Sequence, residues 1–227
     1  MDPSSAFVRA VLSASALFVS HLVCTLIIMR LDLSGKWKEY ALTKDRSVRS
    51  ASDYLIGLRS FLGDLAFVFI PALTLVFWHK GDEIDGASDS ALVSLIKLTL
   101  GYIAGKLWAA AVHYALHHPA LYRFHKKHHC NTKVMVANIA WEDSWVEYCL
   151  MEIPSFALAV LLFPTHFKVH LAHFALHGYD GAANHSGFAA PGFLGYIFNS
   201  EYHYYHREYD MSIKGHEYTK SPLYMLC

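Results

Sequence analysis

The sequence predicts an all-α fold, an integral membrane helical bundle of about four transmembrane helices with a cytoplasmic histidine-rich helical cap. Hydrophobic residues make up 54% of the 227 residues and charged residues 17%, whereas an average soluble domain is about a quarter charged. Four apolar runs approach the roughly 20 residues that a helix needs to cross a bilayer. Six of the 16 histidines lie within residues 113–129, directly after one of these runs.

The apolar runs place the predicted spans at residues 6–29, 60–78, 91–112 and 145–163. A shorter run, 167–177, predicts the returning half of a hairpin. Charged residues inside the spans would each cost roughly 2.5–3.5 kcal/mol at a helix centre facing lipid. Lys97 fits a side chain that reaches out from a helix end, and Glu147 is equally compatible with a polar interior and with the interface. The residues concerned are Asp64, Lys97, Lys106, Glu147 and Glu152.

The charges of the loops predict the orientation of the spans. Residues 30–59 contain seven Lys and Arg, and residues 114–140 contain four with no acid, whereas residues 79–90 contain one Lys against four acids. Because cytoplasmic loops are enriched in Lys and Arg, residues 30–59 and 114–140 are predicted to be cytoplasmic. Residues 145–177 must then cross the membrane and return. This alternation predicts that histidines 113–129, 177–185 and 203–206 share one side of the membrane.

The spacing of the histidines predicts a metal site. His113 and His117 are four residues apart, which places them on one helix face, and residues 125 and 129 repeat this spacing. Neutral imidazole is the commonest metal ligand in proteins. A buried cluster without metal would leave polar nitrogens unsatisfied. Single histidines near the predicted interfaces are instead interpreted as amphipathic interfacial residues, namely His21, His79, His166 and His170.

The number of histidines exceeds what one metal site uses. A zinc site takes four ligands, or three where it is catalytic, whereas eight or nine candidates suit two ions about 3.5–4 Å apart. Imidazole suits iron as well as zinc. Iron adds redox chemistry, which gives a site at the membrane edge a reason to exist.

The segment "HYALHHPALYRFHKKHH" closely resembles the HxxxHH…HKxHH signature of the fatty acid hydroxylase/sterol desaturase superfamily. The later "NHSG" and "EYHYYHRE" are similar to its remaining histidine boxes, and the resemblance covers roughly residues 91–210. It implies a membrane di-iron oxygenase with two iron ions, for which zinc could substitute in a purified sample. It also implies a membrane lipid substrate, a cytochrome b5 or ferredoxin-like electron donor, and an endoplasmic reticulum location with the active site facing the cytoplasm.

The resemblance assigns roles to individual residues. Residues 113 and 117 match the first box, 125, 128 and 129 the second, and 203 and 206 the third, with 185 as an isolated ligand and 177 as a weaker candidate. His118 and His173 are left open. Carboxylates near the boxes in sequence are expected to orient the ligands, and Asp180 and Glu201 are favoured among them. The full set of candidates is Glu142, Asp143, Glu147, Asp180, Glu201, Glu208 and Asp210. The implied metal ligands are His113, His117, His125, His128, His129, His177, His185, His203 and His206.

The resemblance also divides the chain. Residues 1–90 are expected to form an N-terminal transmembrane hairpin with a basic cytoplasmic loop, and residues 91–227 a fatty acid hydroxylase-like catalytic domain with the histidine boxes. The expected reaction hydroxylates or desaturates a lipid C–H bond. Residues 188–198 are interpreted equally as a lid and as a loop in the interface. The oligomeric state is left open.

Two alternatives remain at this point. One is the sterol desaturase/methylsterol oxidase branch of the same superfamily. The other is a non-catalytic membrane metal-binding scaffold, which Arg207 favours because it replaces the final histidine of the third box and arginine cannot bind metal. The electron donor is expected to be a separate protein, since the His-Pro-Gly-Gly motif of a fused cytochrome b5 is absent. The chain carries no net charge, so nucleic acid is not an expected partner.

Overall fold

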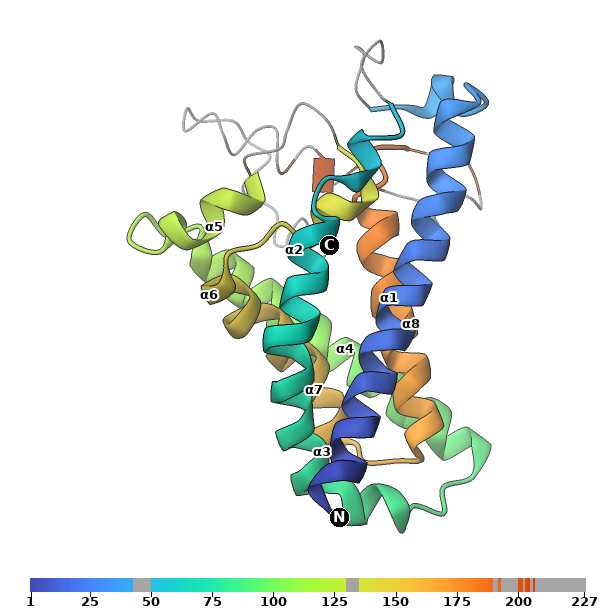
Figure 1. The fold of residues 1–227 in the computed structure, drawn as a ribbon, viewed down its shortest axis with the longest axis vertical. Coiled ribbons are helices and arrows are strands. Elements are labelled where there is room, and N and C mark those ends of the chain that lie inside the picture. The colour runs from blue at the N-terminus through green and yellow to red at the C-terminus, as the bar shows by residue number, and fades with distance from the viewer. Residues whose placement is uncertain are drawn as a thin grey trace.

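The computed structural model describes residues 1–42, 50–129, 135–189, 192, 200–201, 203–204 and 206. Within these residues the fold is built from helices alone, apart from one isolated bridge between Ala41 and Phe188 (Figure 1). Four helices are long and apolar enough to cross a membrane: Pro3–Leu33, Asp53–Asp85, Ala91–Leu116 and Trp145–Leu162. These four helices confirm the predicted fold class and overlap the four predicted spans.

Helix α1 (Pro3–Leu33) packs most extensively on α8 (Phe167–Asn184), and the two lie side by side in Figure 1. The Asp2 side chain accepts hydrogen bonds from the Ser4 and Ser5 backbone amides and so caps α1. Gly178 permits the close approach of the two helices, because a Cβ at this position would overlap the backbone carbonyl of Leu17. The short predicted run at 167–177 is therefore part of a longer helix in the bundle.

The second and fourth spans each contain a π-helical turn. The second consists of α2 (Leu58–Asp64), the π turn η3 (Leu65–Phe69) and α3 (Ile70–Asp85). The fourth consists of α6 (Trp145–Glu147), the π turn η5 (Tyr148–Glu152) and α7 (Ile153–Leu162). In both spans a proline, Pro71 or Pro154, stands two residues after the end of the wider turn. Because proline lacks an N–H and its ring collides with the preceding turn, the wider turn lets the helix continue past it.

Helix α4 (Ala91–Leu116) packs closely on α7 through two glycines one turn apart. A Cβ at Gly101 would lie 2.8 Å from the Cβ of Ala159, and a Cβ at Gly105 would lie 2.5 Å from the Ser155 carbonyl oxygen. Such a pattern of small residues lets helix backbones approach each other in membranes. The contact positions the C-terminal half of α4, where the first histidine box begins, against the fourth span.

The helices run up and down alternately through the bundle (Figure 1). The C-terminal ends of α1, α4 and α8 lie at one end of the molecule, together with helix α5 (Tyr122–His129). Three short helices lie at the same end: η1 (Lys38–Tyr40), η2 (Asp53–Leu55) and η4 (Ala137–Trp141). Residues 86–90 and 163–166 lie at the opposite end. This arrangement agrees with the predicted alternation, including the return of the chain along α8. The histidine boxes therefore lie at one end of the bundle.

Ion pairs join the helices at the opposite end. The N-terminal amine lies 2.7 Å from Asp82, and Arg9 pairs with Asp85. Lys97 lies 2.9 Å from Asp89 and donates to the Pro164 carbonyl oxygen at 2.8 Å, which agrees with its interpretation as a helix-end lysine. The hydrogen bond from Lys97 lowers the pKa of the Asp89 carboxyl below its usual value.

The interpretation of His21 as an interfacial residue is wrong. Its side chain is buried in the bundle, where it accepts a hydrogen bond from Trp141 Nε1 at 3.1 Å through Nδ1. Its Nε2 then carries the proton and donates to Asn138 Oδ1 at 2.9 Å. The sequence shows one polar residue in an apolar run, but the partners are more than 100 residues away. His170 is likewise buried, whereas His79 and His166 are exposed.

Candidate metal centre

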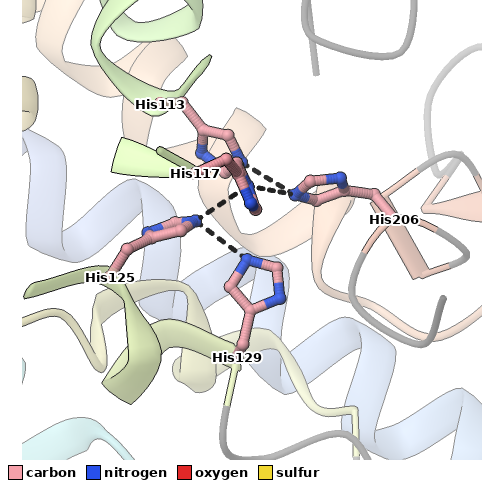
Figure 2. A group of neighbouring side chains, drawn as sticks. All are labelled: His113, His117, His125, His129 and His206. Carbon is pink, nitrogen blue, oxygen red and sulfur yellow. Dashed lines mark hydrogen bonds between the residues drawn. The ribbon is translucent and has the colours of Figure 1, made fainter. Parts of the chain in front are cut away.

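Five histidines from three parts of the chain converge at the end of the bundle (Figure 2). We call them the first group: His113, His117, His125, His129 and His206. The neighbouring Nε2 atoms are separated by 2.8 Å between residues 113 and 206, 3.1 Å between 113 and 117, 3.1 Å between 117 and 206, 3.2 Å between 117 and 125, and 2.8 Å between 125 and 129. The sequence spacing explains two of these pairs, because each is four residues apart on one helix.

Proton sharing among the imidazoles cannot satisfy the first group. A neutral imidazole nitrogen offers either one proton or one lone pair. His113, His117 and His206 all contact one another through Nε2. In a triangle of three nitrogens at least two must be of the same kind, both donors or both acceptors, so at least one of the three contacts cannot be a hydrogen bond. A cation at the point of convergence would satisfy every lone pair at once.

A second group consists of His128, His185 and His203, all buried, whose ligand nitrogens lie within 4.8 Å of one another. The ring centroids of His185 and His203 are 4.1 Å apart, and that of His128 is 5.6 Å from His185. His185 Nδ1 donates to the Gly181 carbonyl oxygen at 2.9 Å. This hydrogen bond leaves its Nε2 as the nitrogen able to bind metal.

Helix α5 supplies histidines to both groups. His125 and His129 are one turn apart and belong to the first group, whereas His128 belongs to the second. Neighbouring residues point about 100° apart around a helix, so the adjacent pair 128 and 129 faces in two directions. The α4 helix ends at Leu116 with His117 as its C-cap, two residues before Pro119, as the sequence predicts. The turn that follows brings α5 back across the end of α4.

Two buried carboxylates orient the second histidine box. Glu147 Oε1 lies 2.6 Å from His125 Nδ1, and Asp143 Oδ1 lies 2.7 Å from His128 Nδ1. Because a carboxylate only accepts, each imidazole donates from Nδ1 and keeps the lone pair of Nε2. Such carboxylate partners fix the tautomer of metal-binding histidines and raise their basicity. Ser144 positions Glu147, because its hydroxyl accepts a hydrogen bond from the Glu147 amide as the cap of α6.

The expectation for Asp180 is wrong within the described residues. Its carboxylate lies 2.6 Å from Lys106 Nζ and accepts a hydrogen bond from Asn184 at 3.1 Å. Glu201 is partly buried, and its role stays a prediction. Glu147 was ambiguous in the sequence because it lies in an apolar run. Asp143 and Glu147 were nevertheless among the candidates from the sequence, and the structure shows that they, and not Asp180, contact the histidines.

The structure brings eight of the nine predicted ligands together in the two groups. The exception is His177, which lies apart from both groups, in contact with the rings of Tyr102 and Phe156. His173 is buried one turn earlier on α8. His118 is exposed, and its Nδ1 accepts from the Ala120 amide. Arg207 and most of the 188–198 segment lie outside the described residues.

The first group fits an ion with more than four ligands. Two nitrogens bound at 2.0–2.1 Å lie about 2.9 Å apart when they are at right angles and about 3.3 Å apart in a tetrahedron. The five contacts span 2.8–3.2 Å, and five donors exceed a tetrahedral set. Iron accepts imidazole ligands in more open geometries. The five nitrogens could therefore hold a metal ion, and their number exceeds the four ligands of a structural zinc site.

The family assignment comes from comparison with known proteins. A model of the family "Fatty acid hydroxylase" matches residues 98–223. No curated protein and no solved structure matches the chain. The family match covers more than half of the chain and includes every histidine of both groups. The chain therefore belongs to the fatty acid hydroxylase family.

Proposed function

We propose that the protein is a membrane-bound di-iron oxygenase that hydroxylates, or desaturates, a C–H bond of a membrane lipid. The observation that carries this proposal is the convergence of eight imidazoles in two groups that share the short helix α5. The family match supports the same class of chemistry. Helices long enough to span a membrane place the two groups at the end of a bundle that a lipid could approach from the side.

The two groups would each hold one iron ion, and zinc could replace iron in a purified sample. The bound iron pair would supply the redox chemistry that reduces O2. Hydroxylation balances as one C–H bond, one O2, two electrons and two protons giving one alcohol and one water. Desaturation uses the same oxidant and electrons and gives one alkene and two waters. The electrons must come from a donor, for which a separate cytochrome b5 or ferredoxin-like protein is suited.

The described residues would perform three tasks around the metals. Glu147 and Asp143 hold a proton on Nδ1 of His125 and His128, so that each Nε2 faces the metal with its lone pair. The bundle and the buried side chains around the groups restrict water. Basic residues exposed on α5, Arg123 and Lys126, lie next to the metal ligands on the same helix. A cluster of this sign suits an acidic electron donor.

The basic loops favour a cytoplasmic active site, and the endoplasmic reticulum is the membrane proposed from the family resemblance. The sterol desaturase/methylsterol oxidase branch would give the same iron content but a sterol product. A non-catalytic scaffold would bind metal without consuming O2 in the presence of a reduced donor.

One experiment tests the proposal. Cells expressing the wild type, His128→Ala and His79→Ala would be compared by lipid profiling, and the purified proteins by metal analysis. His79 is an exposed control histidine. We expect about two iron ions per chain and a new oxidised lipid with the wild type and His79→Ala, and neither with His128→Ala. Fewer than two metals together with an unchanged lipid profile would instead support the scaffold.

A further inference from the structure

A cavity of about 90 Å³ lies next to the two histidine groups, inside the bundle. Its lining includes His113, His128, His185 and His203 on the metal side. The rest of its wall comes from α4, η4, η5, α7 and α8, which pack around it. The cavity therefore connects the candidate metal centre with the interior of the membrane-spanning helices.

Three charged side chains from three helical elements line this cavity: Lys106 of α4, Glu152 of η5 and Asp180 of α8. Lys106 Nζ pairs with Asp180 Oδ2 at 2.6 Å, while Asn184 donates to Asp180 Oδ1 at 3.1 Å. Glu152 interacts electrostatically with both partners of the ion pair. The set contains one cation and two carboxylates, so a second positive or hydrogen-donating group would complete it.

A fourth polar group in the lining also lacks a partner. His177 is 8% exposed and lines the cavity. Its Nε2 has no hydrogen-bond partner among the described residues. Glu152, which is half-buried, also makes no hydrogen bond within the same part of the chain. A buried polar atom without a partner costs free energy, and charged residues within a membrane protein often mark the path of a substrate or an ion. A structural ion pair needs only Lys106 and Asp180, so it does not account for the other two residues.

We propose that this cavity binds the polar end of the lipid substrate and selects a hydrogen-bond donor, an alcohol or a primary amine, over a carboxylate or phosphate. This inference rests on the proposed lipid-oxidising function. The Glu152 carboxylate accepts a hydrogen bond from the polar end of the lipid. Nε2 of His177 forms a further hydrogen bond with the same polar group. An anionic group is disfavoured beside Glu152, because Lys106 is already paired with Asp180 and two carboxylates would then face the anion.

The position of the cavity limits where the lipid is oxidised. Lys106 and His113 are seven residues apart on α4, which is two helical turns and about 10 Å along the axis. A lipid whose polar end occupies the cavity therefore presents carbons near that end to the metal groups. The proposal thus predicts oxidation close to the polar group and not at the far end of a long chain.

The test uses the purified full-length protein in detergent and native mass spectrometry to measure binding. Four probes share one saturated 18-carbon chain and differ only in the polar end: octadecanol, octadecylamine, octadecanoate and octadecyl phosphate. The variants are Glu152→Gln and His177→Phe, with Lys97→Met as the control. Lys97 is also an ion-paired lysine of α4 but does not line the cavity. Iron content and thermal unfolding are measured for each protein, which separates loss of binding from loss of fold.

We expect the alcohol and the amine to bind and the two anions to bind at least roughly tenfold more weakly. Glu152→Gln should weaken amine binding by about tenfold or more, the range for a lost charge-assisted hydrogen bond. His177→Phe should weaken both donors, and Lys97→Met should keep the wild-type preference. Equal or tighter binding of the anions would overturn the inference, as would folded, iron-containing Glu152→Gln and His177→Phe proteins that bind the donors like the wild type.

Product analysis separates this inference from the proposed function. Oxidation of an anionic lipid alone would keep the oxygenase and refute the selectivity of the cavity. Selective binding of the alcohol and amine without oxidation of any lipid would keep the cavity and refute the oxygenase.

Discussion

Replacing Glu147 by alanine removes the acceptor for the Nδ1 proton of His125. Both side chains are fully buried, and the two atoms are 2.6 Å apart. Loss of such a partner of a metal-binding histidine typically costs about 10- to 100-fold in metal affinity, which corresponds to about 1.4–2.7 kcal/mol. Leaving a buried N–H unsatisfied costs about 1–3 kcal/mol. The two ranges agree, so we expect iron affinity to fall by about one to two orders of magnitude.

A graded series makes this prediction specific. Glu147→Gln keeps an oxygen acceptor but loses the charge, and charge-assisted hydrogen bonds are about twice as strong as neutral ones. The glutamine variant should therefore lose about three- to tenfold in affinity, less than alanine. Iron affinity would be measured by competition with a chelator and metal analysis, with circular dichroism to follow the fold. Glu83→Gln, which changes an exposed carboxylate paired with Lys80, is the control.

The result that would refute the reasoning is simple. If Glu147→Ala folds and binds iron as tightly as the wild type, the carboxylate does not support a metal ligand. If glutamine and alanine weaken binding equally, the charge is the only property that matters, and the proposed role of the acceptor geometry is wrong.

Three further predictions concern the bundle that holds the site. Gly178→Ala should destabilise the protein by about 1–3 kcal/mol, the usual cost of overpacking, because the new Cβ meets the Leu17 carbonyl; thermal unfolding compared with Gly63→Ala, where a Cβ meets open space, checks this. His21→Phe should lower stability by about 1–3 kcal/mol because Trp141 and Asn138 lose a buried hydrogen-bond partner; chemical unfolding beside His79→Phe would detect it, and equal stability of the two would contradict the buried network. The pKa of Asp89 is lowered in the folded state, so its ion pair stabilises the fold above the unfolded pKa of about 3.8 and loses this contribution as the pH falls through the folded pKa. The difference in melting temperature between the wild type and Asp89→Asn should therefore shrink in acid. A difference that stays constant with pH would refute this linkage.

The sequence predicts the parts of this structure that depend on local patterns. Runs of apolar residues identify the spans, because a helix that crosses the bilayer needs about 20 apolar residues in succession. The four-residue spacing of His113 and His117 identifies a common helix face because the helical repeat is local. Pro119 marks the end of α4 for the same reason. Loop charges then suffice to predict which helix ends share a side.

The sequence could not predict contacts between distant segments. The division of α5 between two groups depends on where α8 and the C-terminal histidines lie, and spacing alone does not separate His128 from His125. Sequence distance also favoured Asp180 as a histidine partner, whereas the fold places Lys106 beside it. Asp143 and Glu147 contact the second box because η4 is held against α1 and α8 by buried residues. None of these contacts has a local signature.

The sharing of α5 has a consequence for the proposed binding of two ions. The first ion to bind would fix the orientation of this eight-residue helix through His125 and His129, and with it the direction of His128. The second ion would then meet a ligand that is already ordered, so less conformational entropy is lost on its binding. Iron uptake should therefore be cooperative, with chains containing either both ions or none at intermediate iron concentrations.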